Sequence, residues 1–347
     1  MKKYIPYLII ILALGGAAIW FYLHNTPESI NKREGSFAVP EKDITKVVME
    51  DEKGAHVEIT KGNGLWMVNS KYVAREELVK QVLEAVSRVT SLAPVPKNGH
   101  DNVIREITTK YIKVSVFENN SDKPTKSYWV GGPTVDGRGT YMLLDMGSKA
   151  ASRPHITYVP GIQGYLTPRF EMDAEVWRSR VVFNYQPEEI QSLKVEYPAD
   201  EKKSFFIHQV ALDSFAVDPV VEANRIHVDY EQKYVKQYLN FYSSIYMEAF
   251  DNSNAAKDSI SKTTPYCIFT ITEKDSSVNQ VKMFYMPFNK RSKALYDEKG
   301  FQMTYDVDRY YATVHNGEDF TVVQYYVFGK LLRQYKDFFF KPTEAAQ

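Results

Sequence analysis

Apolar and polar residues alternate along much of the chain after residue 43, which is the pattern of half-buried β-strands. Two such stretches, ITKVVMED (44–51) and HVEITKG (56–62), flank a turn at Glu52-Lys53-Gly54 and predict a hairpin. In the segment 75–90 the apolar residues recur every three or four positions, so we predict an amphipathic helix there. A further strand at LWMV precedes this helix. A short helix near 102–107 and four strands follow it, at YIKVSVFE, KSYWVGG, GTYMLLDM and HITYVP.

The same order of elements recurs in the second half of the chain. IQSLKVEY (190–197) corresponds to ITKVVMED, and SFAVD corresponds to LWMVN. A second helix is predicted over 230–250, and its apolar positions repeat the spacing of the first helix at every step. In the second helix these positions are Tyr234, Val235, Tyr238, Leu239, Tyr242 and Ile245. In the first helix they are Leu78, Val79, Val82, Leu83, Val86 and Val89. VKMFYMP (281–287) aligns with TKSYWVG (125–131), and RYYATVH with GTYMLLD. The pattern therefore predicts an internal repeat of one β-rich unit.

Strands that form hairpins and then meet a helix predict an α+β fold. We expect two tandem, duplicated lobes of antiparallel or mixed sheet, with helices packed on one face. The first lobe is expected to occupy residues 43–183 and the second 184–340, followed by a tail over 341–347.

An uncharged apolar run, YIPYLIIILALGGAAIWFYL (4–23), stands before these lobes. As a helix it would span about 30 Å, the thickness of a bilayer's hydrocarbon core. Lys2 and Lys3 precede it, which favours a cytoplasmic N-terminus and a body on the far side of the membrane. A cleaved signal peptide is the alternative, but the run continues for five apolar residues after its small residues, which favours an uncleaved anchor. We therefore predict a transmembrane anchor over 1–24 and a polar tether, without a core of its own, over 25–42.

Composition narrows the choice of partners. The chain has 43 basic and 43 acidic residues, so it lacks the net positive charge typical of nucleic-acid binding. Cys267 is the only cysteine, which excludes an intramolecular disulfide, and its place in the strand YCIFTI predicts a small buried apolar side chain.

The sequence contains no motif that specifies a reaction. It has no GxxxxGK[ST] phosphate loop, no HExxH and no GxSxG, and its seven histidines are not spaced as metal ligands on one helix. Ser259-Ile260-Ser261-Lys262 fits the SxxK pattern of penicillin-recognising enzymes, but two common residues at that spacing occur by chance. Asp306-Val307-Asp308 places two carboxylates on one strand face, either as a solvated surface or as a cation contact. We expect no enzyme activity, no cofactor and no metal.

Several segments together carry a resemblance to a known family. FAVPEKDITKVVMED, LWMVNSKYVAR, VGGPTVDGRGTYMLLD, PGIQGYLTPRF and VWRSRVVF resemble the domain of unknown function numbered 4340. The resemblance covers roughly residues 37–340 and is clearest over 44–183. The family is widespread in bacteria of the Bacteroidota type, and a related domain occurs in auxiliary components of gliding-motility-type ABC transporters. It has no established catalytic residues, so the resemblance implies an extracytoplasmic envelope protein, with a possible transporter association, and no site to carry over.

The segment 160–180 is the candidate partner or ligand surface. PGIQGYLTPRF has two glycines and two prolines within nine residues, so we predict an irregular, constrained loop. Tyr, Trp and Arg are enriched at binding hot spots, and the segment is rich in such residues. The candidate residues are Tyr165, Arg169, Phe170, Trp177, Arg178 and Arg180. The alternative is a packed joint in which Trp177 belongs to the core and the arginines pair with acids.

These patterns favour a single-pass protein of the inner membrane, with a periplasmic or other extracytoplasmic body. We expect that body to be a non-catalytic accessory module that binds another envelope protein, with a transporter complex as one candidate. Two alternatives stay open: a glycan or lipid binder that uses an aromatic cleft between the lobes, and an unrecognised hydrolase with polar side chains converging in a cleft.

Overall fold

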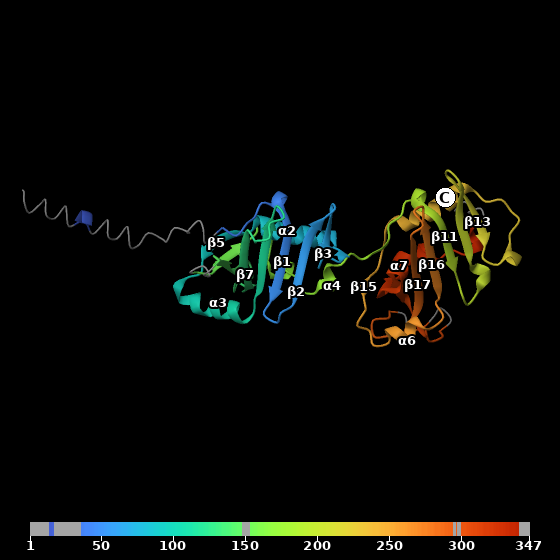
Figure 1. Ribbon diagram of the computed structural model, residues 1–347. Coiled ribbons are helices and arrows are strands. Elements are labelled where there is room, and N and C mark those ends of the chain that lie inside the picture. The colour runs from blue at the N-terminus through green and yellow to red at the C-terminus, as the bar shows by residue number, and fades with distance from the viewer. Residues whose placement is uncertain (1–13, 17–35, 148–152, 294–295, 297–299, 340–347) are drawn as a thin grey trace, which may run out of the picture. The chain divides into compact units, whose positions relative to one another are not determined.

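The computed structural model describes residues 14–16, 36–147, 153–293, 296 and 300–339. The chain divides into two compact units, Met1–Ser179 and Arg180–Gln347, so the division lies four residues before the predicted lobe boundary. Each unit contains one large antiparallel sheet and short helices, which confirms the predicted α+β class (Figure 1).

Nine strands form the sheet of the first unit, in the order β4-β3-β2-β1-β6-β7-β8-β9-β5. They are β1 (Ile44–Asp51), β2 (His56–Gly62), β3 (Leu65–Val68), β4 (Tyr72–Val73), β5 (Thr90–Pro94), β6 (Ile112–Glu118), β7 (Lys126–Pro133), β8 (Thr140–Asp145) and β9 (His155–Tyr158). The helices of this unit are α2 (Glu76–Arg88), α3 (Lys97–Thr109) and α4 (Ala174–Trp177), with 3-10 turns η2 (Glu41–Asp43) and η3 (Thr167–Arg169).

Eight strands form the sheet of the second unit, in the order β13-β12-β11-β16-β17-β18-β19-β15. They are β11 (Ile190–Glu196), β12 (Phe205–Ala211), β13 (Ser214–Pro219), β15 (Ala249–Phe250), β16 (Cys267–Glu273), β17 (Val278–Pro287), β18 (Tyr305–Val314) and β19 (Asp319–Gln324). A separate pair is formed by β10 (Val181–Phe183) and β14 (Ile245–Tyr246). The helices are α5 (Gln232–Asn240), α6 (Lys257–Ser261) and α7 (Tyr325–Phe328). The 3-10 turns are η4 (Pro187–Glu189), η5 (Glu201–Lys203), η6 (Glu222–Asn224), η7 (Phe241–Ser243), η8 (His315–Gly317), η9 (Gly329–Leu331) and η10 (Tyr335–Phe338).

The two sheets share one topology. Without β4, the first sheet reads β3-β2-β1-β6-β7-β8-β9-β5, and the second has the corresponding strand at each position. The register agrees as well: Val47 lies opposite Ile59 and Val116, while Leu193 lies opposite Ile207 and Ile271. In both sheets the pairing register shifts directly after the first residue of the corresponding strand, which is Ile44 in β1 and Ile190 in β11. This shared order and register supports the internal repeat.

One part of the predicted repeat alignment is wrong. The sequence pairs Tyr128 with Phe284, but Tyr128 lies opposite Val114, and the counterpart of Val114, Phe269, lies opposite Val281. The true counterpart of Tyr128 is therefore Val281, three residues earlier. The physical reason is loop length, because the connection between β6 and β7 is longer than the tight turn between β16 and β17.

The helix predicted over 75–90 is present as α2, and its apolar stripe is buried in the core of the first unit. The tether, by contrast, was predicted too long. Phe37 and Val39 are buried in the same core, and Val39 N donates to Val86 O at 3.1 Å. Polar residues surround Phe37 and Val39 in the sequence, so their alternation was not recognised as part of the folded unit. Both side chains add to the core before β1 begins.

The second predicted helix, 230–250, is much shorter in the structure. It is α-helical only over α5 and continues as η7, and the residues that follow form the short strands β14 and β15. The apolar spacing continues as far as Ile245, but Ile245 pairs with Phe183 in β10, and Ala249 pairs with Val322 in β19. Strand pairing thus overrides the helical pattern. The first unit has the same arrangement, because β5 follows α2 and pairs with β9.

The predicted anchor, residues 4–23, lies outside the described residues except for 14–16. Among the helices that the structure describes, none is both long and apolar enough to cross a membrane.

Candidate functional site

The segment 160–180 does not form one exposed surface. Phe170 and Trp177 are 2% and 1% exposed and belong to the core of the first unit. The indole Nε1 of Trp177 donates to Glu171 O at 2.8 Å, so its polar group is satisfied inside the protein. These two residues are therefore core residues, as the alternative of a packed joint predicted for Trp177, and neither is an exposed part of a partner surface.

Arg178 is also largely buried, and it extends the edge of the first sheet. Its guanidinium lies 3.7 Å from the ring centroid of Tyr72, a cation–π contact. The backbone beside it pairs with the end of β4, because Arg75 N donates to Trp177 O and Ser179 N donates to Val73 O. The chain at 177–179 therefore covers a sheet edge that would otherwise offer unpaired backbone groups.

The other three candidates are scattered. Tyr165 is exposed, and Arg169 is half-buried at the end of η3. Arg180 belongs to the second unit, where its carbonyl oxygen accepts from Met247 N at 2.9 Å. The six candidates are thus not brought together.

The Pro- and Gly-rich loop itself is irregular, as predicted, but it is held against the sheet. Gly161 and Gly164 both have positive φ, which glycine adopts without strain. Leu166 is buried, its N donates to Thr140 Oγ1 at 2.7 Å, and Thr167 Oγ1 donates to Gly131 O at 2.7 Å. The loop therefore covers the end of β7 and β8.

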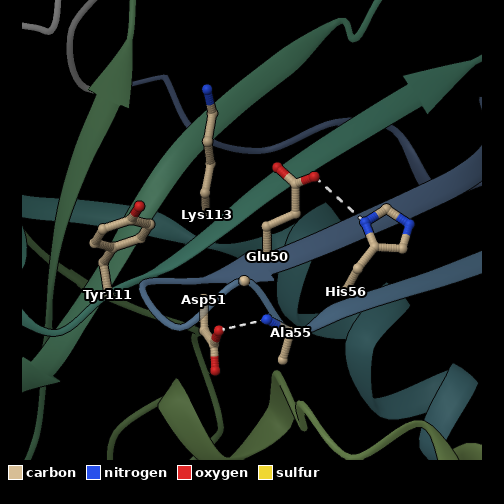
Figure 2. A pocket seen from close by; sticks show the side chains of 7 residues that line it. Glu50, Asp51, Ala55, His56, Tyr111 and Lys113 are labelled. Atoms are coloured by element: carbon tan, nitrogen blue, oxygen red, sulfur yellow. Dashed lines mark hydrogen bonds and ion pairs between the residues drawn. The ribbon is translucent and has the colours of Figure 1, made fainter.

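A cavity of about 210 Å³ lies at the β1–β2 hairpin of the first unit (Figure 2). Figure 2 shows Glu50 and His56 turned towards each other, and the Nδ1–Oε1 distance is 3.3 Å. The Oδ1 atom of Asp51 accepts from Ala55 N at 2.8 Å, which closes the turn. Lys113 is paired with Asp145, with 3.1 Å between Nζ and Oδ2.

This cavity does not have the character of a catalytic site. The side chains of Glu50 and His56 are about half exposed, so their attraction is screened by water. Asp51 is engaged by the backbone of its own turn. Nowhere in the described parts of the chain do three or more His, Cys, Asp or Glu side chains gather as metal ligands.

The other polar features noted in the sequence have structural partners. Asp306 is 3% exposed rather than solvated, and it accepts from Ser292 Oγ at 2.6 Å and from the backbone N of Asp308 and Arg309. Ser259 Oγ donates to Ala256 O at 2.8 Å. Cys267 is buried, as predicted, and burial raises the pKa of its thiol well above the ordinary range, so it is not a ready nucleophile.

A row of tyrosines at one end of the second sheet is the most distinctive surface of the described chain. We call Tyr266, Tyr285, Tyr305 and Tyr310 the tyrosine row. Tyr266 and Tyr310 stack with ring centroids 5.3 Å apart, and Tyr285 and Tyr305 stack at 4.6 Å. Tyr266 joins the two pairs, because its centroid lies 4.9 Å from that of Tyr285.

The sheet fixes the positions of these rings. Tyr285 in β17 lies directly opposite Tyr310 in β18, and Tyr305 begins β18. Tyr266 N donates to Met283 O at 2.8 Å, which aligns it beside β17. Exposure rises along the row, from 9% at Tyr310 to 43% at Tyr285 and 44% at Tyr305. The row is therefore anchored at its buried end and open at the other.

Three phenol groups of the row are neutral at physiological pH. Burial raises the pKa of Tyr266, Tyr285 and Tyr310 above the ordinary value. Each of these three hydroxyls therefore keeps its proton and can donate a hydrogen bond to a ligand. Tyr325 and Tyr326 in α7 add two more exposed rings to the unit.

Sequence reasoning missed this row. The count of 25 tyrosines was visible, but the four rings come from two strands, β17 and β18, and from Tyr266 just before β16, and they meet only through the strand register. One feature of the sequence could have indicated the row. The predicted strands RYYATVH and VKMFYMP both carry aromatic residues and are expected to be neighbours in the sheet.

No family model matches the chain, no curated protein is detectably similar to it, and no solved structure matches its fold. The resemblance to the domain of unknown function numbered 4340 therefore stays a prediction.

Proposed function

We propose that this chain is a membrane-anchored, extracytoplasmic and non-catalytic module that binds another protein of the cell envelope, in an accessory or transporter-associated complex. The tyrosine row of the second unit is the binding surface, and residues 4–23 are the anchor. The exposed, stacked tyrosines are the observation that carries the proposal.

Tyrosine suits this role for a physical reason. Its ring offers a large apolar area, its hydroxyl offers a hydrogen bond, and it loses little conformational freedom on binding because it has two side-chain torsions. Stacking within the row restricts those torsions before any partner arrives, so less entropy is lost on binding.

The anchor supports the same proposal. Its uncharged run has the length of a membrane span, and the preceding lysines favour a cytoplasmic N-terminus. The body then lies outside the cytoplasm and close to one membrane, where an envelope partner would be met.

Duplication followed by divergence explains why only one unit would bind. By register, Tyr310 corresponds to Thr140 and Tyr285 to Gly132, so the first unit has small residues at two positions of the row, although Tyr266 corresponds to a ring, Tyr111. In the first unit, the chain's own loop also covers this end of the sheet. We propose that the first unit is structural and the second binds.

The test is chemical crosslinking in native membranes, followed by purification of the full chain and mass spectrometry. We expect one envelope protein to be recovered at high yield with the natural chain and at several-fold lower yield with a Tyr285→Ala, Tyr305→Ala double variant. Tyr165→Ala, a similarly exposed tyrosine in the first unit, is the matched control and keeps the full yield. A natural chain recovered alone and monomeric contradicts the proposal.

A glycan ligand is the second candidate, because an exposed aromatic face can also stack on a sugar ring. It predicts that the double variant loses binding to an oligosaccharide while its crosslinked protein partners are unchanged.

A further inference from the structure

The connection between β17 and β18 is an addition to the repeated unit. It covers residues 288–304, whereas the corresponding connection between β7 and β8 covers only 134–139. In the first unit this connection is a tight turn, in which Gly137 N donates to Thr134 O at 2.8 Å. We call residues 288–304 the hairpin extension. The first unit forms the shared fold without such an extension, so the fold itself does not require it.

Hydrogen bonds fix the start of the hairpin extension to the sheet. Ser292 Oγ accepts from Asn289 N at 3.1 Å and donates to the buried carboxylate of Asp306 at 2.6 Å. The turn over 289–292 is therefore held against β18. Lys290 and Arg291 lie inside this turn and are exposed, so the turn presents two positive charges to solvent.

The hairpin extension combines positive charge with exposed aromatic rings. Tyr296 and Phe301 are 62% and 69% exposed, and a β-bridge between Tyr296 and Gln302 brings the two rings to the same part of the hairpin. Over its whole length the extension has four basic and two acidic residues, so its net charge is positive. Three of the basic side chains are exposed in the described part: Lys290, Arg291 and Lys293.

We infer that the hairpin extension binds the anionic surface of the membrane in which the chain is anchored. The inference rests on the proposed anchor but not on the tyrosine row. Basic side chains are attracted to anionic lipid headgroups. Aromatic rings such as those of Tyr296 and Phe301 are favoured where headgroups meet acyl chains. A membrane surface therefore matches both the charge and the exposed rings of the extension.

The anchor makes a weak contact of this kind sufficient. Stable attachment of a protein to a membrane takes two signals, and the anchor is the first. Because the anchor holds the body near the surface, binding of the extension is an intramolecular event with a high effective concentration. The attachment then restricts the orientations that the second unit adopts above the membrane.

The test uses the full chain, reconstituted through its anchor into nanodiscs of phosphatidylglycerol or of phosphatidylcholine. Cys267 is the only cysteine and is buried, so a Gln302→Cys substitution provides one accessible thiol for the environment-sensitive dye nitrobenzoxadiazole. We expect the dye emission to increase and to shift to shorter wavelength in phosphatidylglycerol but not in phosphatidylcholine. This response should be lost in roughly 1 M salt, where the Debye length is about 3 Å.

Two controls separate membrane binding from other causes. Leu212→Cys is the matched position, because Leu212 is 90% exposed between β12 and β13 of the same unit, and its dye should not respond. The combined substitutions Lys290→Gln, Arg291→Gln and Lys293→Gln should abolish the response at position 302. Circular dichroism checks that this variant is folded, and if it is not, the salt dependence of the natural extension decides.

The inference is overturned if the dye at position 302 responds equally in both lipids, or if its response survives high salt or the glutamine substitutions in a folded chain. An equal response from position 212 also overturns it. A chain that does not insert into the nanodiscs contradicts the anchor and the inference together. A chain that inserts but shows no response at position 302 contradicts the inference alone.

Discussion

Single aromatic residues in this chain differ in burial, which separates core residues from candidates for binding. Trp177 and Phe170 are enclosed in the first core, whereas Tyr285 and Tyr305 leave more than 40% of their surface in contact with solvent. Sequence alone could not assign these roles, because Trp and Tyr are enriched both in cores and at binding surfaces.

Trp177 tests this assignment. We expect Trp177→Ala to lower the free energy of unfolding by about 3–5 kcal/mol, because it removes a fully buried ring and leaves a cavity. Tyr165→Ala, in the same segment but exposed, should change it by less than about 0.5 kcal/mol. Urea unfolding followed by circular dichroism measures both, and equal effects would mean that Trp177 is not a core residue.

Gln232 protects an exposed sheet edge. Its side-chain amide accepts from Phe215 N at 2.9 Å and donates to Phe215 O at 2.8 Å, so it imitates a neighbouring strand on β13. We predict that Gln232→Leu lowers the free energy of unfolding by about 1–3 kcal/mol, because it leaves these backbone groups without that partner. Self-association should also rise, since the edge can then pair with a second copy.

Light scattering and urea unfolding check this prediction. Gln191→Leu is the control. Gln191 is exposed in β11, so this substitution adds the same apolar side chain to the surface but away from the sheet edge. Aggregation of both variants to the same extent would show that added apolarity, not loss of the edge cap, is the cause.

At the scale of elements, helix α3 and the end of β7 fit each other through a glycine. A Cβ at Gly131 would lie 2.8 Å from Ile107 Cγ1 and 3.3 Å from Tyr141 O. We therefore expect Gly131→Ala to lower the free energy of unfolding by about 1–3 kcal/mol through overpacking. Gly62→Ala in β2 meets open space and should be nearly neutral, and thermal unfolding distinguishes the two. A neutral Gly131→Ala would mean that α3 does not pack closely on β7.

The periodicity of apolar residues predicted most helices and strands, but it did not predict the residue at which each one ends. The hairpin at 44–62 and the helix over 75–90 were readable because one face of each is buried. The helix over 230–250 was overextended because Ile245 and Ala249 keep an apolar pattern while pairing with distant strands. The short strands β4, β5, β10, β14 and β15 have too few residues to show a period at all.

At the scale of the whole molecule, the sequence repeat predicted two units of one topology, and strand order and register agree with it. The proposed binding surface could not be predicted in the same way, because it depends on what differs between the units. Thr140 holds the segment that covers this end of the first sheet, whereas its counterpart in the second unit, Tyr310, belongs to the tyrosine row. Function is thus proposed to lie in the divergence, with the anchor setting where the partner is met.

The most direct test places a photo-crosslinking amino acid, benzoylphenylalanine, at position 285 of the full chain in living cells. We predict a single, light-dependent protein adduct in the membrane fraction from position 285, and none from position 165 in the first unit. An equal adduct from both positions, or none from position 285 in a chain that is present in the membrane, would contradict the account.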